Sequence, residues 1–371
     1  MTSKWSRIGL ALTLAGMTQV SAAAIKPAEK AAKAQKPHRI ATTSADRPAK
    51  AAPQAPAFIR DRIRELVRTV DGPVGVAVKS LDDGWEAGWR DHELFPQQSV
   101  SKLWVAIAVL DAVDRGKISL DQKVTLTRKD LTLFHQPIRD DILKGGSYTT
   151  TIGDLLTRQI TTSDNTANDR LMRSVGGPQA IRAMIARKHL GAIRFANGEK
   201  LMQSKIAGVT WNSSYSIGDA FWAARDKVPI KKRSAAFARY VADPYDGAAP
   251  SAIVNALARL KRGELLSRSS TDYLLDVMSH THTGPQRLHG GLSAGWTLNH
   301  KTGTGQELGG YQAGYNDIGI LTAPDGKSYA VAVMMKKVSV PLVKRMQMMS
   351  NVTRAVIAQH DLGAGAGTTA R

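Results

Sequence analysis

The chain of 371 residues contains no cysteine, so a disulfide, a thiol nucleophile and a thiolate metal site are all excluded. Negative charge is also scarce, because 31 Asp and Glu face 51 Lys and Arg and leave a formal net charge of +20. This excess comes with no nucleic-acid-binding motif and no basic–aromatic pattern, so we expect no nucleic-acid partner. An apolar fraction of 43% is ordinary for a globular protein with a substantial core.

Long apolar runs are lacking as well, and the run over residues 8–17 is too short to span a bilayer. It follows Lys4 and Arg7 and precedes the small residues VSAAA, which is the pattern of a cleaved signal peptide over residues 1–24. The alternative is an apolar first helix of the folded domain. We therefore expect a periplasmic or secreted protein.

Residues 25–57 are rich in Ala, Lys and Pro and show no apolar periodicity, which predicts a disordered linker. Seven Lys or Arg against one Glu and one Asp make this linker basic. It would be attracted to an anionic envelope surface, whereas the alternative is a solvated segment that only aids solubility. Residues 363–371, GAGAGTTAR, are expected to form a disordered tail.

Strand patterns occur at both ends of residues 58–362, and a mostly helical stretch lies between them. This order predicts one sheet built from both ends of the chain and covered by the terminal helices, with a helical insertion. The expected α/β lobe covers about 58–98 and 290–362, and the expected all-α lobe covers about 99–289.

The stretch LFPQQSVSKLWVAIAVLDAV places a serine three residues before a lysine, at the start of an expected helix over 99–115. Residues three apart share a helix face, so Ser99 and Lys102 would point into one site. A serine hydroxyl needs a base to become a nucleophile, and burial favours the neutral lysine that can serve as one. The pair alone is a weak signal, because S-x-x-K also occurs by chance with a solvated lysine.

Two further segments strengthen this signal, since S-x-x-K, S-D-N and K-T-G in this order are typical of serine β-lactamases and penicillin-binding proteins. The segment TTSDNTAND supplies the S-D-N motif. Its Ser163 can relay a proton between the lysines and the leaving nitrogen. Its Asn165 can bind a substrate amide.

The segment HKTGTG supplies the third motif at the end of an expected strand. Lys301 brings positive charge near a substrate carboxylate, and Thr302 brings a hydroxyl donor. The backbone N–H groups of Ser99 and Thr304 would form an oxyanion hole. Gly303 would let a substrate lie against the strand backbone.

On these residues the chain resembles the class A β-lactamase family over about 58–360, with FPQQSVSK, SDNTAND, RGELL, GLSAGW, KTGTG and YNDIGIL in the family's order. The resemblance implies the β-lactamase/D,D-peptidase fold, a five-stranded antiparallel sheet flanked by helices and joined to a helical lobe. It also implies a monomeric serine hydrolase that opens small-molecule β-lactams and needs no cofactor.

The segment RFANGEKLMQS aligns with the family's Ω-loop. The resemblance implies that Glu199 activates the water for deacylation and that the amide of Gln203 helps to hold it; the alternative is a surface glutamate. Asn197 stands where the family usually has an Arg, and Asp169 replaces an Asn. The segment 204–250 is far longer than the family's loop, which puts the deacylation rate in doubt.

No Arg follows the K-T-G motif, so the resemblance implies that Arg287 pairs with the substrate carboxylate; the alternative is a solvated Arg. Phe134 and His135 stand where an aromatic gatekeeper is common. Four aromatic residues of the long segment are expected to form its small core or to wall the site: Trp211, Tyr215, Phe221 and Trp222. Three histidines lack a ligand framework, so no metal is expected: His280, His282 and His289.

The sequence therefore predicts a β-lactamase that works through an ester on Ser99. Either Lys102, or Glu199 through a water, would be the base for acylation. One rival is a D,D-peptidase acting on peptidoglycan stem peptides. The other is a weakly catalytic sensor that binds β-lactams or muropeptides, against which the complete catalytic set argues.

Overall fold

A computed structural model of the chain describes residues 53–368. The predicted signal peptide and residues 25–52 of the predicted linker lie outside the described residues. The end of that linker is ordered, however, because Gln54 pairs with Glu86 and Ala55 is buried against the domain. Among the helices of residues 53–368, none combines the length and the apolar character needed to cross a membrane.

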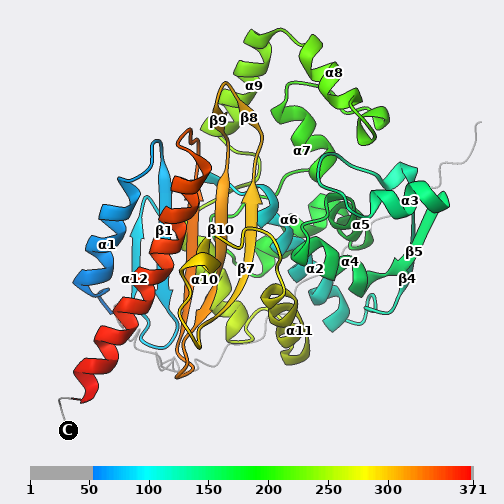
Figure 1. Ribbon diagram of the computed structural model, residues 1–371. Coiled ribbons are helices and arrows are strands. Elements are labelled where there is room, and N and C mark those ends of the chain that lie inside the picture. Colours follow the sequence, from blue (N-terminus) through cyan, green and yellow to red (C-terminus); the bar gives the residue numbers. More distant parts are fainter. Residues whose placement is uncertain (1–52, 369–371) are drawn as a thin grey trace, which may run out of the picture. The chain divides into compact units, whose positions relative to one another are not determined.

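The central element is a five-stranded antiparallel sheet, which confirms the expected fold (Figure 1). Its order, β2-β1-β11-β10-β7, places the first strands of the domain next to the last, as the strand patterns at both ends predict. The strands are β1 (Val74–Ser80), β2 (Glu86–Trp89), β7 (Thr297–Thr304), β10 (Tyr315–Thr322) and β11 (Ser328–Met335).

Both faces of the middle of the sheet are buried, because side chains of β1, β10 and β11 alternate between two apolar cores. Figure 1 shows α1 (Ala57–Val67) and α12 (Leu342–Thr368) side by side on one face, where Val333 of β11 joins their core. On the other face, Ala332 packs with α10 (Pro250–Lys261). The sheet is therefore a rigid support for whatever lies at its β7 edge.

Helix α12 continues to Thr368, so the disorder predicted for residues 363–371 does not hold for 363–368. Extending an existing helix costs little once its first turns are nucleated, and no proline interrupts this stretch. Residues 369–371 lie outside the described residues.

The helical lobe surrounds α2 (Lys102–Asp114), whose residues from Lys102 to Ala112 are all buried. The expected helix over 99–115 thus begins one turn later as an α-helix, because a 3₁₀ turn, η1 (Gln98–Ser101), comes first. The helices packed against α2 are α4 (Ile152–Thr161), α5 (Asn165–Ser174), α6 (Gly177–Arg187) and α11 (Arg268–Ser279), while α3 (Arg139–Gly145) packs beside β5.

This lobe also contains a strand pair that was not predicted, β4 (Lys123–Thr127) with β5 (Ser147–Thr151). The Thr-rich run SYTTT favours a strand, because β-branched residues fit a pleated, half-buried surface.

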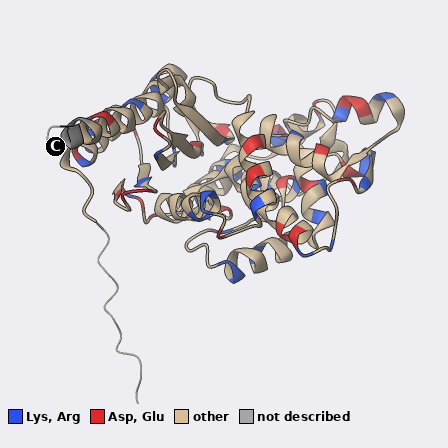
Figure 2. Cartoon of the chain, turned by 90° about the horizontal axis from the view of Figure 1, so that it is seen from below, with Lys and Arg blue, Asp and Glu red and all other residues tan. Residues whose placement is uncertain are grey.

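Figure 2 shows Asp and Glu interspersed with Lys and Arg over the helices of the described chain. The short turn η2 (Arg128–Asp130) belongs to the helical lobe, whereas η4 (Leu288–Gly291) packs against α12.

The long segment after Glu199 folds into helices of its own. Figure 1 shows α8 and α9 at one end of the molecule, beyond α7 and close to β8 and β9. Its elements and their short strand partners are α7 (Glu199–Ile206), η3 (Ser213–Ser216), α8 (Ala220–Lys227), α9 (Ile230–Ala242), β6 (Gly247–Ala248) with β3 (Phe95–Pro96), and β8 (Glu307–Leu308) with β9 (Tyr311–Gln312).

Candidate active site

Ser99 lies half-buried in η1, at the mouth of a cavity of about 380 Å³ between the sheet edge and the helical lobe. The backbone just before it is strained, since Gln98 has a φ of +54°. Such left-handed non-glycine residues persist only where their surroundings hold them, and they concentrate at functional sites. The cavity is lined by Ser99, Phe134, His135, Asn165, Gln203, Trp222, Arg225, Thr304, Gly305, Gln306 and Glu307.

The end of β7 lies directly against the turn that carries Ser99. A Cβ on Gly303 would come within 2.3 Å of the Gln97 carbonyl oxygen, so only glycine permits this approach. Asn316 on the neighbouring strand fixes the same turn by donating its side-chain amide to the carbonyls of Pro96 (2.7 Å) and Gln97 (3.0 Å). The close approach brings Ser99 and Thr304 onto one cavity.

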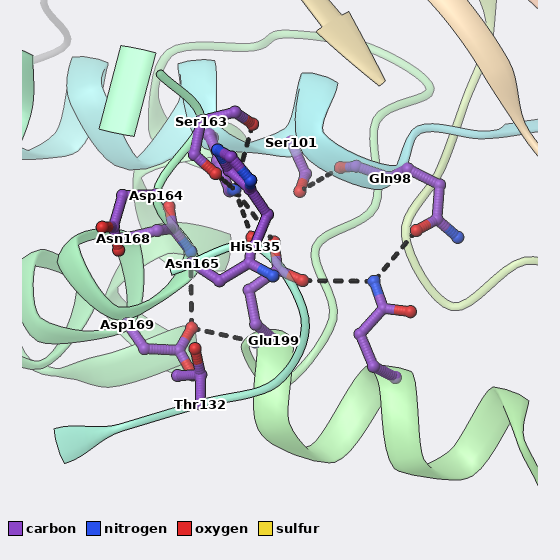
Figure 3. A network of polar contacts seen from close by, with 12 residues as sticks. Gln98, Ser101, Thr132, His135, Ser163, Asp164, Asn165, Asn168, Asp169 and Glu199 are labelled. Carbon is purple, nitrogen blue, oxygen red and sulfur yellow. Dashed lines mark hydrogen bonds and ion pairs between the residues drawn. The ribbon is translucent and has the colours of Figure 1, made fainter. Parts of the chain in front are cut away.

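Lys102 lies beneath the cavity with no exposed surface. Its Nζ donates to the carbonyl oxygen (2.6 Å) and Oγ (3.2 Å) of Ser163 and to Oδ1 of Asn165 (2.5 Å), and it lies 3.6 Å from Oε1 of Glu199. Figure 3 shows Ser163, Asn165 and Glu199 converging at this point. Burial lowers the pKa of Lys102, although the nearby Glu199 carboxylate opposes that shift.

Ser163 connects the two lysines of the motifs, which the sequence places 199 positions apart. Its Oγ accepts from Lys102 Nζ (3.2 Å) and from Lys301 Nζ (3.0 Å). Its φ of +62° turns the S-D-N segment into the cleft. Burial, reinforced by the Lys102 charge, holds the pKa of Lys301 well below its ordinary value. The three motifs therefore meet around one hydroxyl.

Glu199 is the first residue of α7 and is only 3% exposed, which contradicts the alternative of a surface glutamate. Its Oε2 accepts from Nε2 of Gln203 (3.2 Å), and the same amide nitrogen donates to Oε1 of Gln98 (2.9 Å). The Gln203 side-chain oxygen in turn accepts from Gln306 (2.9 Å). Gln203 therefore ties the carboxylate of Glu199 to the residue before Ser99.

The loop before Glu199 is held by Asp169 and Arg182. Asp169 accepts from the backbone nitrogens of Glu199 (2.9 Å) and Lys200 (3.4 Å), while burial and the Glu199 charge raise its pKa to about 6. Arg182 of α6 donates to the carbonyl of Phe195 (2.9 Å) and to the side chain of Asn197 (3.2 Å). These contacts hold the segment in which Asn197 replaces the expected Arg.

A buried polar network beneath η1 was not predicted from the sequence. The backbone nitrogen of Gln98 donates to Asp246 Oδ2 (2.7 Å), its side chain donates to the Tyr240 hydroxyl (2.5 Å), and that hydroxyl donates to Asp246 Oδ1 (3.0 Å). Burial raises the pKa of Asp246 to about 7 and that of Tyr240 above its ordinary value. No spacing signal connects Gln98 to the other two residues, because it precedes Tyr240 by 142 positions and Asp246 by 148.

Residues 58–360 of this chain match the model of the β-lactamase enzyme family. The chain belongs to the class A β-lactamase family. It is 32% identical to the extended-spectrum β-lactamase PER-1 of Pseudomonas aeruginosa, over 75% of this chain and 80% of that one. It is 27% identical to β-lactamase VEB-1 of the same organism, over 74% and 81% of the two chains.

Solved structures agree with this family and its fold. A β-lactamase from Chitinophaga pinensis superposes with a TM-score of 0.69 at 30% identity, covering 81% of this chain and 99% of that one. The ancestral GNCA β-lactamase of class A superposes with a TM-score of 0.64 at 27% identity, covering 81% and 99%. The resemblance stated from the motifs is therefore confirmed.

Within this class A framework, Arg287 is buried behind β7 rather than solvated. It donates to the carbonyls of Gly303 (3.1 Å) and Asn316 (2.7 Å) and to the Thr304 hydroxyl (2.5 Å). Its guanidinium also stacks 3.9 Å from the centre of the Tyr315 ring. Its charge thus lies next to Thr304, and its pairing with a substrate carboxylate stays a prediction.

The other predicted groups lie as follows. The Thr302 hydroxyl contacts that of Thr283 (2.6 Å). Phe134 and His135 both line the cavity, and Trp222 lines it while Phe221 is buried in the core of the long segment. Among residues 53–368, no group of His, Asp and Glu side chains is arranged to hold a metal ion.

Proposed function

We propose that this chain hydrolyses β-lactams in two steps, through an ester on Ser99. The observation that carries the proposal is the position of Lys102 Nζ, buried between Ser163 Oγ, Asn165 Oδ1 and Glu199 Oε1 and below the cavity that Ser99 lines. A lysine amine and a carboxylate beside one serine supply both the base and the water activator that such a reaction needs.

In the acylation step, Ser99 Oγ attacks the lactam carbonyl and its proton passes to neutral Lys102, or to Glu199 through a water. The lowered pKa of Lys102 supports the first route, and the burial of Glu199 beside it supports the second. Within residues 53–368 no hydrogen bond joins Ser99 to Lys102, and catalytic hydrogen bonds often tighten only once substrate is bound.

As the lactam C–N bond breaks, the Ser163 hydroxyl protonates the leaving nitrogen and regains a proton from the lysines that contact it. The backbone N–H groups of Ser99 and Thr304 stabilise the oxyanion. Asn165 binds the substrate amide. Lys301 and Thr302 receive the substrate carboxylate, and Arg287 acts on it from behind Thr304.

In the deacylation step, Glu199 takes a proton from a water held with the amide of Gln203, and that water attacks the ester carbonyl. The ester C–O bond breaks, Ser99 recovers its proton and the ring-opened acid leaves. The 3.2 Å contact between Gln203 and Glu199 supports this pairing. We also propose that the protein acts outside the cytoplasm, on the pattern of residues 1–24.

Purified protein mixed with nitrocefin, and separately with a fluorescent penicillin, tests the proposal. We expect steady turnover in the wild type and a stable acyl-enzyme in Glu199→Ala, while the surface variant Glu65→Ala turns over normally. Persistent labelling of the wild type would favour the D,D-peptidase instead. If neither the wild type nor Ser99→Ala is labelled or turns over nitrocefin, both catalytic hypotheses fail and only the sensor hypothesis remains.

A further inference from the structure

The long segment after Glu199 contributes side chains to the same cavity as Ser99. Two residues of α8, Trp222 and Arg225, line this cavity together with Gln203 and Thr304. They come from the part of the chain that exceeds the family's usual loop. Their role therefore has to be deduced from their own surroundings.

Aromatic packing holds α8 against Phe134, which lines the cavity. Phe221 is 2% exposed and meets the Phe134 ring edge-on at 5.0 Å, within an apolar cluster that includes Leu133. Trp222 lies 5.6 Å from the same Phe134 ring but is 42% exposed. The indole is thus fixed in place while a large part of it stays accessible, as a preformed stacking surface would be.

Arg225 completes this surface with a positive charge. Its guanidinium carbon lies 5.1 Å from the centre of the Trp222 ring, and the side chain is half-buried. Among the ion pairs of residues 53–368 none involves Arg225, whose guanidinium contacts the Trp222 ring, although Glu307 lines the same cavity. The guanidinium therefore keeps its donors for a ligand, and an anionic group beside an aromatic ring fits the pair.

We propose that Trp222 and Arg225 form a subsite that favours β-lactams whose acyl side chain combines an aryl ring with a carboxylate. This inference rests on the proposed function. A substrate with its lactam carbonyl at Ser99 and its acylamino group at Asn165 would place its acyl side chain in the same cavity. Gln203, Trp222 and Arg225 line that cavity too.

Benzylpenicillin and carbenicillin are a matched pair for this test, because they differ by one carboxylate on the acyl side chain. The quantity to compare is kcat/KM for carbenicillin divided by kcat/KM for benzylpenicillin. We expect this ratio to be about fivefold higher in the wild type than in Arg225→Gln, as for a half-exposed charge pair. Arg225→Glu should lower the ratio further. Arg239→Gln removes the same charge from an exposed position on α9 that does not line the cavity, and it should leave the ratio unchanged.

The role of Trp222 is tested with 6-aminopenicillanic acid, which has no acyl side chain. Trp222→Ala should lower kcat/KM for benzylpenicillin about fivefold and leave that for 6-aminopenicillanic acid within twofold. Retained turnover of the latter, with an unchanged Tm, shows that the variant is folded. Ile230→Ala, which truncates an exposed apolar side chain on α9, is the control.

The outcomes separate the two proposals. If the wild type turns over none of these penicillins, the proposed function fails. If it turns them over while the carbenicillin ratio is the same in wild type, Arg225→Gln and Arg239→Gln, only the subsite is overturned. Equal losses with all three substrates in Trp222→Ala also overturn it, because a stacking surface cannot act on a substrate without a side chain.

Discussion

The two walls of the cleft are held in place by different forces. Lys102 sits on a helix that is apolar and buried on every side, so hydrophobic packing fixes its position. Glu199 sits on a short helix whose start is held by buried polar contacts from Asp169 and Gln203. In the mechanism that we propose, acylation would therefore depend on a packed core, whereas deacylation would depend on a few hydrogen bonds that pH and single substitutions can remove.

Removing Lys102, one of the two proposed bases for acylation, should have the largest effect. We expect Lys102→Ala to slow acylation about 10²–10⁴-fold, because it removes a proposed base and the amine that lies 3.6 Å from Glu199 Oε1. Stopped-flow labelling with a fluorescent penicillin measures this step directly. The apolar core around α2 should remain packed in this variant. We therefore expect a small change in Tm together with the large loss of acylation rate.

A matched control is Lys117→Ala, which removes the same kind of side chain beyond the end of α2. Its acylation rate should equal that of the wild type. A Lys102→Ala enzyme that acylates at the wild-type rate would show that Glu199 alone is the base, and would remove the distinction between the two walls.

Asp169→Asn should act on the other wall and on the other step. The new side chain keeps one acceptor for the Glu199 nitrogen but turns an N–H donor toward Lys200, so Glu199 shifts. A shift near 1 Å costs about a hundredfold, so we expect deacylation to slow by about 10–100-fold while acylation changes much less. Single-turnover kinetics separate the two rates, with the exposed Asp121→Asn as control.

The pKa of Asp169 adds a pH signature to this prediction. Only the ionised carboxylate offers acceptors to both nitrogens, so the wild-type deacylation rate should fall as pH drops through about 6. Asp169→Asn should lack that part of the profile. An identical acid limb in both proteins would assign the limb to another group.

The same contrast explains what could be predicted from the sequence. Ser99, Lys102, Ser163 and Lys301 were predictable, because each lies in a short motif whose spacing the chemistry dictates. Gln98, Tyr240 and Asp246 were not, because they meet only through folding and none has a local pattern. Gly303 was predicted to let a substrate lie against the strand backbone. The structure adds a second reason for glycine, because a Cβ at this position would clash with the Gln97 carbonyl oxygen.

The elements of the fold also divide into those that local patterns predicted and those that form only through contacts distant in the sequence. Strand and turn patterns at both ends of the domain predicted the strands and their assembly into one sheet, and the family resemblance implied that there are five. The helices α8 and α9 within the long segment were not predicted in detail. Their cores are small, and aromatic contacts such as Phe134 with Phe221 join parts of the chain that no periodicity links.

Asp246 offers a way to measure how much the polar network contributes to stability. Its pKa is about 7 when folded and 3.8 ordinarily, so the native state binds more protons than the unfolded state between about pH 4 and 7. Its contribution to the free energy of unfolding therefore falls as pH rises through this window and is flat above it. Asp246→Asn should lose less stability than the wild type between pH 5 and 8.

Urea unfolding at the two pH values tests this difference. Asp243→Asn removes an exposed carboxylate nearby and should follow the wild type. Asp169 acts in the same direction in both proteins, so the comparison between them isolates Asp246. A variant whose stability falls as steeply as that of the wild type would place the titration elsewhere.

The smallest effect is expected at Arg182, which holds the loop before Glu199 from the exposed side. Arg182→Gln removes hydrogen bonds to the Phe195 carbonyl and the Asn197 side chain, and should lower the free energy of unfolding by about 0.5–1 kcal/mol. These contacts hold the loop and not the core. The rate of limited proteolysis within residues 194–198 should therefore rise more than the rate of global unfolding. Equal changes in both rates would mean that the loop wall and the packed wall unfold as one unit, and the contrast between them would fail.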